Sequence, residues 1–152
     1  MNNLVIREAR LDDAKAMVEL LQPIIDAGLT AIKTSSVEEQ LEFIELFPKA
    51  GVFLVAIDGD TGKLLGMQDV MYTDESGVSE IGTFVDLEWR GYGIGHKLFT
   101  EIIRRLEVKN INQIKAIVQA SNKNAVAFYS KLGFQNFVPY GDKVIGLYNL
   151  PD

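Results

Sequence analysis

The segment Arg90-Gly91-Tyr92-Gly93-Ile94-Gly95 carries three glycines at alternate positions, where a β-branched stretch gives way to a helical pattern. Glycine adopts positive φ at no steric cost, so several N–H groups of such a turn can point toward one anion at the start of a helix. Arg90 at the edge of the turn adds a side chain suited to phosphate oxygens. The segment therefore indicates a strand, a turn and a helix that together bind phosphate. A glycine-rich helix start without a ligand is the alternative for this stretch taken alone.

Two common phosphate-binding loops do not fit this segment. A P-loop ends in Gly-Lys followed by Ser or Thr, whereas Gly95 is followed by His96 and Lys97. A dinucleotide-binding loop also fails, because the sixth position counted from Gly91 is His96 and the next strand, which ends at Gln119, carries no acidic residue for a ribose. The segment therefore disfavours ATP and NAD as ligands.

Hydrophobic periodicity predicts the elements on both sides of the turn. Runs rich in β-branched residues predict strands, and apolar residues at helical spacing predict helices. Strands are expected at 4–6, 52–57, 64–72, 78–85, 114–118, 134–140 and 144–150, and helices at 11–25, 35–47, 92–110 and 124–132. The order is β-α-α-β-β-β-α-β-α-β-β. Since no repeat or linker interrupts it, residues 1–152 are expected to form one domain.

A second motif lies downstream of the glycine turn, Asn122-Lys-Asn-Ala125-Val-Ala-Phe128-Tyr129-Ser-Lys-Leu-Gly133-Phe134. It resembles the Asn-x-x-Ala-x-x-x-Tyr-x-x-x-Gly-Phe element of the GNAT superfamily of acetyl-CoA-dependent N-acetyltransferases. The turn beginning at Arg90 resembles the acetyl-CoA signature of the same family, although Leu87 stands where the family often has Pro. The resemblance implies an α/β fold of the GNAT type, with a mixed, mostly antiparallel sheet of six or seven strands flanked by about four helices.

The resemblance also implies acetyl-CoA as cosubstrate and no metal. In this family the strand before the turn and the strand after the following helix move apart, often at a β-bulge, and the pantetheine arm pairs with the first strand. The main chain of Phe84 and Val85 would bind this arm, and Asn122 would face it across the cleft. The pyrophosphate would bind at the turn, to residues Arg90, Gly91, Tyr92, Gly93, Ile94 and Gly95.

Acetyl transfer to an amine requires two proton transfers. The acceptor ammonium, with a pKa of about 10.4, must lose a proton, and the leaving thiolate, with a pKa of about 8.5, benefits from an acid. Tyr129 matches the family tyrosine near the sulfur and is the expected general acid, with a packed core ring as the alternative. Glu80 is the candidate general base, with a solvated strand residue as the alternative. His96, the single histidine, is expected at the surface or near the cofactor.

Charge and composition restrict the partners. A net charge of -6 and a pI of about 4.8 disfavour binding to nucleic acid, which requires clustered Lys and Arg, and suit a cationic amine. The absence of Cys excludes a thiolate nucleophile and agrees with the direct attack in a ternary complex that is expected from the family resemblance. The apolar runs are only strand-sized and no targeting signal is evident, so neither a membrane partner nor a location outside the cytoplasm is expected.

The acceptor is expected to be a small-molecule or amino-acid-like primary amine. A protein or peptide amine and a non-catalytic acyl-CoA-binding module are the alternatives, and a homodimer is kept open because many relatives dimerise. Asp26, near the loop at 27–34, is a candidate partner of the ammonium. Trp89 and Tyr92 either stack on an adenine or need no ligand.

Overall fold

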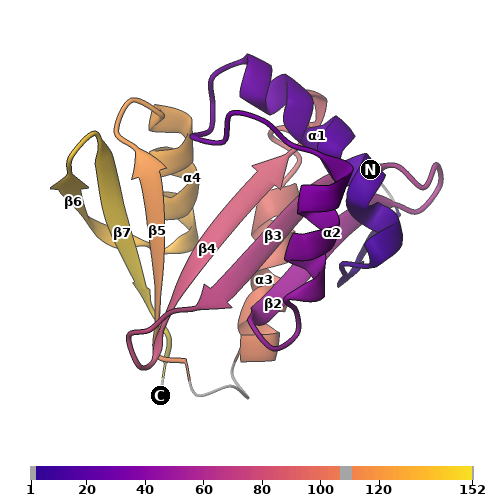
Figure 1. The fold of residues 1–152 in the computed structure, drawn as a ribbon. Coiled ribbons are helices and arrows are strands. Elements are labelled where there is room, and N and C mark those ends of the chain that lie inside the picture. Colours follow the sequence, from indigo (N-terminus) through magenta and orange to yellow (C-terminus); the bar gives the residue numbers. More distant parts are fainter. Residues whose placement is uncertain (1–2, 107–110, 152) are drawn as a thin grey trace.

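The computed structural model describes residues 3–106 and 111–151, and its elements follow the expected order (Figure 1). Short 3-10 turns at Leu11–Asp13 and Leu87–Trp89 precede the first helix and the glycine turn. The expected end of the long helix near residues 109 and 110 lies outside the described residues. The strands are β1 (Leu4–Glu8), β2 (Gly51–Asp58), β3 (Leu64–Tyr72), β4 (Val78–Val85), β5 (Gln113–Gln119), β6 (Gln135–Tyr140) and β7 (Lys143–Asn149), and the helices are α1 (Ala14–Asp26), α2 (Val37–Glu45), α3 (Ile94–Leu106) and α4 (Lys123–Leu132).

The strands form one seven-stranded sheet in the order β1-β2-β3-β4-β5-β7-β6. Every neighbouring pair is antiparallel except β4 and β5, which run parallel. In Figure 1, α1 and α2 lie in front of the sheet and α3 and α4 lie behind it. Each pair of helices encloses its own apolar core against one face, and successive side chains of β2 alternate between the two cores, Leu54 in one and Val55 in the other. The expected mixed, mostly antiparallel α/β fold is confirmed.

The parallel pairing of β4 and β5 covers only the first half of each strand. It ends at Ile81 and Ala116, so residues 82–85 and 117–119 have no partner across this boundary within the described part of the chain. The register of β3 with β4 runs without a shift as far as Val85. The two strands therefore separate as expected, but without the β-bulge that often accompanies the separation in this family, because β4 keeps its regular pairing with β3.

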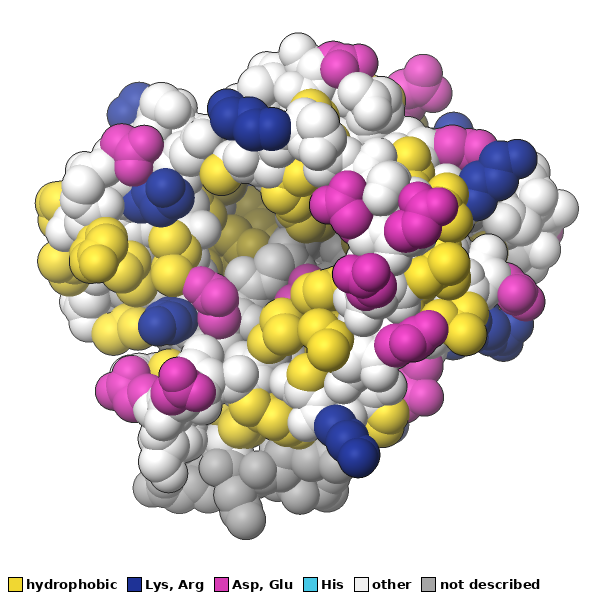
Figure 2. Space-filling model, in the orientation of Figure 1, with side chains coloured by type: hydrophobic (Ala, Val, Ile, Leu, Met, Phe, Trp, Pro, Cys, Tyr) yellow, Lys and Arg dark blue, Asp and Glu magenta, His cyan; other side chains and the backbone are white. Residues whose placement is uncertain are grey.

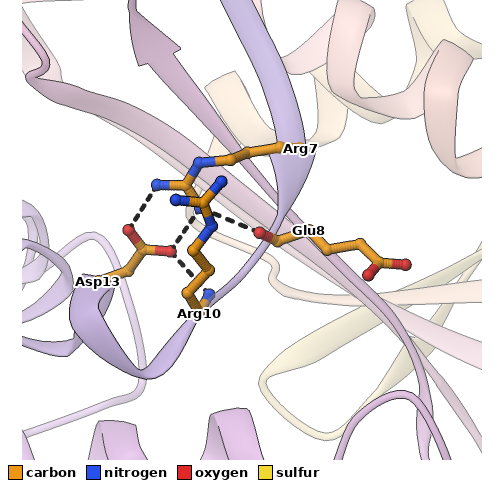
Figure 3. A network of polar contacts seen from close by, with 4 residues as sticks. All are labelled: Arg7, Glu8, Arg10 and Asp13. Carbon is orange, nitrogen blue, oxygen red and sulfur yellow. Dashed lines mark hydrogen bonds and ion pairs between the residues drawn. The ribbon is translucent and has the colours of Figure 1, made fainter.

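A partly buried ion pair fixes the start of α1 against β1 (Figure 3). Arg7 donates two hydrogen bonds of 2.8 Å to the two carboxylate oxygens of Asp13, and the Arg10 amide donates a third of 2.8 Å. Burial raises the pKa of Asp13, but these hydrogen bonds outweigh it and hold that pKa below its usual value. The pair sets the position of α1, whose far end reaches the site described next.

No helix in residues 3–106 or 111–151 is long and apolar enough to cross a membrane. The same residues contain no cluster of three or more His, Asp or Glu side chains placed to hold a metal ion.

Candidate active site

A pocket of about 1090 Å³ opens where β4 and β5 separate. Ile24, Leu29 and Phe43 line it from the side of α1 and α2, and Gly95 and Phe128 line it from the side of α3 and α4. Figure 2 shows the corresponding hollow in the front face, with hydrophobic side chains inside it, acidic side chains at its right edge and lower left, and Lys or Arg side chains above it and to its left. The pocket therefore passes through the sheet and joins its two faces.

The glycine turn forms one end of this pocket. Gly91 and Gly93 have φ values of 83° and 77°, and a Cβ at either position would meet no atom within 4 Å. The first helical bond of α3 runs from the Lys97 amide to the Gly93 carbonyl, so the amides of Ile94 and Gly95 have no acceptor inside the helix. Open space, free amides and the positive end of the helix dipole fit a pyrophosphate.

Of the other residues expected at the turn, Arg90 borders the pocket and the Tyr92 side chain does not. Arg90 lines the pocket and has no ion-pair partner among the described residues. Tyr92 is 55% exposed, lies outside the pocket wall and packs against Trp89 with ring centroids 5.1 Å apart. Only Trp89 of this aromatic pair borders the pocket.

The backbone of β4 presents hydrogen-bonding groups to the gap. The Asp86 amide donates to the Leu65 carbonyl of β3, so alternation along the strand directs the Phe84 main chain toward β3 and the Val85 and Thr83 main chains toward β5. Since β5 has moved away there, the Val85 and Thr83 amides face the pocket. Phe84 contributes its side chain to the pocket wall instead.

Tyr129 of α4 reaches the pocket from the buried side. Its ring is only 5% exposed and packs edge-on against Phe134, with centroids 5.2 Å apart, while its hydroxyl donates to Thr83 Oγ1 at 3.0 Å. Burial raises the pKa of Tyr129 well above its ordinary value, and the charge of Asp69 adds to this, although the bond to Thr83 acts in the opposite direction. The phenol therefore carries its proton throughout the neutral pH range.

Two carboxylates also line the pocket. Glu80 of β4, the candidate base of the sequence analysis, is half-buried there, and Asp69 of β3 is a neighbour that the sequence analysis missed. Asp69 pairs with Gly82 and Met71 pairs with Glu80, so the two carboxylates are diagonal neighbours on one face of the sheet. Burial raises the pKa of Asp69 to about 7, and the charge of Glu80 adds to the increase.

A sequence signal for Asp69 did exist. It is the single charged residue in the strand Leu64–Tyr72, where the remaining side chains are apolar apart from Gln68 and the Tyr72 hydroxyl. A charged residue in the middle of a buried strand requires a partner or a function.

Two other candidates have structural contacts. Asn122 borders the pocket, but it also caps α4, because its Oδ1 accepts from the Ala125 amide at 3.0 Å and its Nδ2 donates to the Leu29 carbonyl at 3.3 Å. Asp26 lies outside the pocket wall, is exposed and accepts a hydrogen bond from Gln22. Asn122 therefore joins α4 to the loop after α1, and Asp26 does not face the site.

Comparison with known proteins agrees with this geometry. The family model described as "Acetyltransferase (GNAT) family" matches residues 16–134, a range that includes the glycine turn, both carboxylates and Tyr129. The chain belongs to the GNAT acetyltransferase family. The relative L-2,4-diaminobutyric acid acetyltransferase of Halalkalibacterium halodurans is 28% identical over 129 residues, which cover 85% of this chain and 64% of that enzyme.

Solved structures of this family share the fold. An N-acetyltransferase from Staphylococcus aureus Mu50 superimposes with a TM-score of 0.84 at 21% identity, covering 99% of this chain and 100% of that one. A GNAT phosphinothricin acetyltransferase from Sinorhizobium meliloti, solved in complex with acetyl-CoA, gives 0.82 at 20% identity, covering 97% of this chain and 89% of the other. The fold is therefore the GNAT fold over its full described extent.

Proposed function

We propose that this GNAT protein transfers the acetyl group of acetyl-CoA to the primary amine of a small molecule by direct attack in a ternary complex. The observation that carries the proposal is the pocket through the sheet at the separation of β4 and β5. It joins a phosphate-binding turn and a protonated tyrosine on one side to two carboxylates on the other. An amine and a thioester that enter from opposite faces would meet between these groups.

The chain's own residues fit acetyl-CoA, which supplies a thioester with an electrophilic carbonyl carbon. The amides of the turn at 91–96 and the guanidinium of Arg90 would bind its pyrophosphate. The main chains of Thr83 and Val85 would pair with the pantetheine arm, which would take the place of β5 beside this end of β4. The Val85 amide is also the candidate donor to the thioester oxygen, where negative charge develops during attack.

Asp69 and Glu80 supply the base. An amine attacks only after its ammonium has lost a proton, and a base works best when its pKa lies near the working pH. The pKa of Asp69, raised to about 7, meets this condition. We therefore assign proton removal to Asp69, with Glu80 as the neighbouring charge that attracts the ammonium and keeps the pKa of Asp69 high.

Tyr129 supplies the acid. Its hydroxyl donates a hydrogen bond to Thr83 of β4, beside the gap between β4 and β5, and it stays protonated at neutral pH. When the carbon–sulfur bond breaks, the sulfur carries the negative charge and accepts the Tyr129 proton. A thiolate formed in an apolar pocket is a stronger base than in water, because desolvation disfavours the charged form. Burial raises the pKa of the phenol as well, so the proton transfer depends on the thiolate reaching the Tyr129 hydroxyl directly.

The acceptor side favours a small cationic amine. Its wall combines the apolar side chains of Ile24, Leu29 and Phe43 with the carboxylates of Asp69 and Glu80. Two similar proteins act, by their names, on diaminobutyric acid and phosphinothricin, both of them small molecules with an amine. The acidic side chains at the right edge of the hollow in Figure 2 would also attract a cationic amine.

The test is CoA release from acetyl-CoA over a panel of alkylamines, diamines, amino acids and basic peptides, with each product identified by mass spectrometry. We expect small amines to be acetylated at the nitrogen. Preferential acetylation of the peptides would identify a protein acceptor instead. Acetyl-CoA binding by calorimetry with no acetylated product from any class would favour a non-catalytic acyl-CoA-binding module.

A further inference from the structure

Gln68 is a buried polar side chain to which the proposed mechanism gives no role. It lies in the middle of β3 and its exposed fraction is 0%. A buried amide is unfavourable unless its polar atoms are hydrogen bonded, so such residues are kept only where their contacts compensate. The contacts of Gln68 lead directly to Tyr129.

The Gln68 amide joins three elements around the pocket. Its Nε2 donates to Thr83 Oγ1 on β4 at 3.0 Å and to the Gly95 carbonyl in the first turn of α3 at 3.4 Å. Gln68 and Thr83 are directly opposite each other in the sheet. Thr83 Oγ1 is the same atom that accepts the hydrogen bond of Tyr129 at 3.0 Å. One amide therefore connects the hydroxyl that holds Tyr129 to the turn suited to a phosphate.

We propose that Gln68 is a positioning residue for acetyl transfer, whose amide fixes the Thr83 hydroxyl so that the Tyr129 hydroxyl stays at a set place relative to the phosphate-binding turn. The inference rests on the proposed function. Gln68 acts through Thr83 and contacts neither substrate. Without its amide, Thr83 can change its side-chain rotamer, and Tyr129 loses a fixed acceptor. Small displacements of a reacting group reduce turnover strongly.

The unused end of the amide supports a functional reason for Gln68. Its Oε1 is buried and has no hydrogen-bond partner among the described residues. Methionine has a similar length and no unpaired oxygen, so Gln68→Met removes the donor to Thr83 without leaving a buried polar atom of its own. If Gln68 served stability alone, this strand would favour an apolar residue. The denaturant concentration at the unfolding midpoint of Gln68→Met is therefore expected to equal or exceed that of the wild type, while turnover falls.

The experiment is a double-mutant cycle measured on CoA release with the best acceptor amine. Gln68→Met is expected to lower kcat on the order of tenfold, the loss of one aligned hydrogen bond, with the KM of the amine unchanged. In a Tyr129→Phe background the same change should have little further effect, because no hydroxyl remains to be positioned. Thr83→Val should reproduce the loss without adding to it. Gln113→Met is the control, because it removes a hydrogen bond from Gln113 to Asn149 on β7 and should leave kcat unchanged.

A second readout does not depend on turnover. In protein labelled with fluorotyrosine, the fluorine resonance of Tyr129, assigned by its absence in Tyr129→Phe, should shift or broaden in Gln68→Met and stay unchanged in Gln113→Met. An unchanged resonance, or an equal fall in kcat in both backgrounds, would overturn the role of Gln68 and leave acetyl transfer standing. If no amine is acetylated, the proposed function fails, and the resonance alone decides whether Gln68 positions Tyr129.

Discussion

Replacing Asp69 by asparagine removes the carboxylate whose pKa the pocket raises most clearly. The change from 3.8 to about 7 means that ionising this group costs more in the folded protein than in the unfolded chain. At about 1.4 kcal/mol per pKa unit the full difference is roughly 4 kcal/mol, and partial contact with solvent reduces it to roughly 2 kcal/mol. Asparagine has a similar shape and no charge, so it avoids this cost.

The sign of the pH dependence follows from proton binding. Between pH of about 4 and about 7 the folded protein holds a proton on Asp69 that the unfolded chain has lost, so the free energy of unfolding falls as pH rises through this window. In Asp69→Asn this decrease is absent. Urea unfolding of both proteins from pH of about 4.5 to about 8 should therefore show the variant gaining roughly 2 kcal/mol over the wild type.

Turnover should change in the opposite direction. Asp69→Asn should lower kcat/KM on the order of a hundredfold or more, the usual contribution of a general base. In the wild type, kcat/KM should rise through pH of about 7 as Asp69 ionises, and Glu80→Gln should move this limb to lower pH because the Glu80 charge helps to raise the pKa of Asp69. Asp74→Asn, in the exposed turn between β3 and β4, is the control. The reasoning would be refuted if the free energy of unfolding had the same pH dependence in Asp69→Asn and the wild type, and if Asp69→Asn also kept the wild-type turnover.

Two further changes test the turn and the fold. Gly93→Ala forces a φ of 77° on a residue with a Cβ and should weaken acetyl-CoA binding by about 1 kcal/mol in calorimetry. The control is Gly62→Ala, which has the same φ and the same open space in a distant turn and should leave the affinity unchanged. Equal weakening in both variants would contradict a specific role of the glycine turn. Asp13→Ala leaves the Arg7 guanidinium without its carboxylate and should cost about 3 kcal/mol of unfolding free energy at neutral pH. This loss should shrink as pH falls below the ordinary pKa of Asp13, because protonation then removes the ion pair from the wild type as well. A loss of stability that is independent of pH would contradict the ion pair.

The sequence predicted the elements well because their signals are local. The capping serine of α2 illustrates this, since the Ser36 hydroxyl accepts a hydrogen bond from the Glu39 amide, as the spacing indicates. Gly133 ends α4 with a φ of 112°, which a glycine at that position also indicates. Such features depend on residues within one turn of each other and need no tertiary information.

The site was less predictable because its groups come from different strands and helices. Tyr129 was proposed because it belongs to a motif and Glu80 because of its place on the strand before the turn, but Asp69 belongs to no motif and its proposed role depends on the register that places it diagonally to Glu80. The contacts of Gln68 with Thr83 and Gly95 join residues 15 and 27 positions apart. The absence of the family's frequent β-bulge was unpredictable for the same reason, because only the register of β3 with β4 shows that the strand stays regular. Strand register and packing decide these contacts, and periodicity does not reveal them.

The most direct test of acetyl transfer is CoA release with the best small amine, compared between the wild type and Tyr129→Phe at matched acetyl-CoA saturation. The mutation removes one hydroxyl from a ring that stays packed against Phe134, so folding and acetyl-CoA binding should be retained. The account predicts an N-acetylated amine and a kcat that falls on the order of a hundredfold in the variant. Equal kcat in the two proteins would contradict the role of Tyr129, and no acetylated amine from the wild type would contradict the proposed reaction itself.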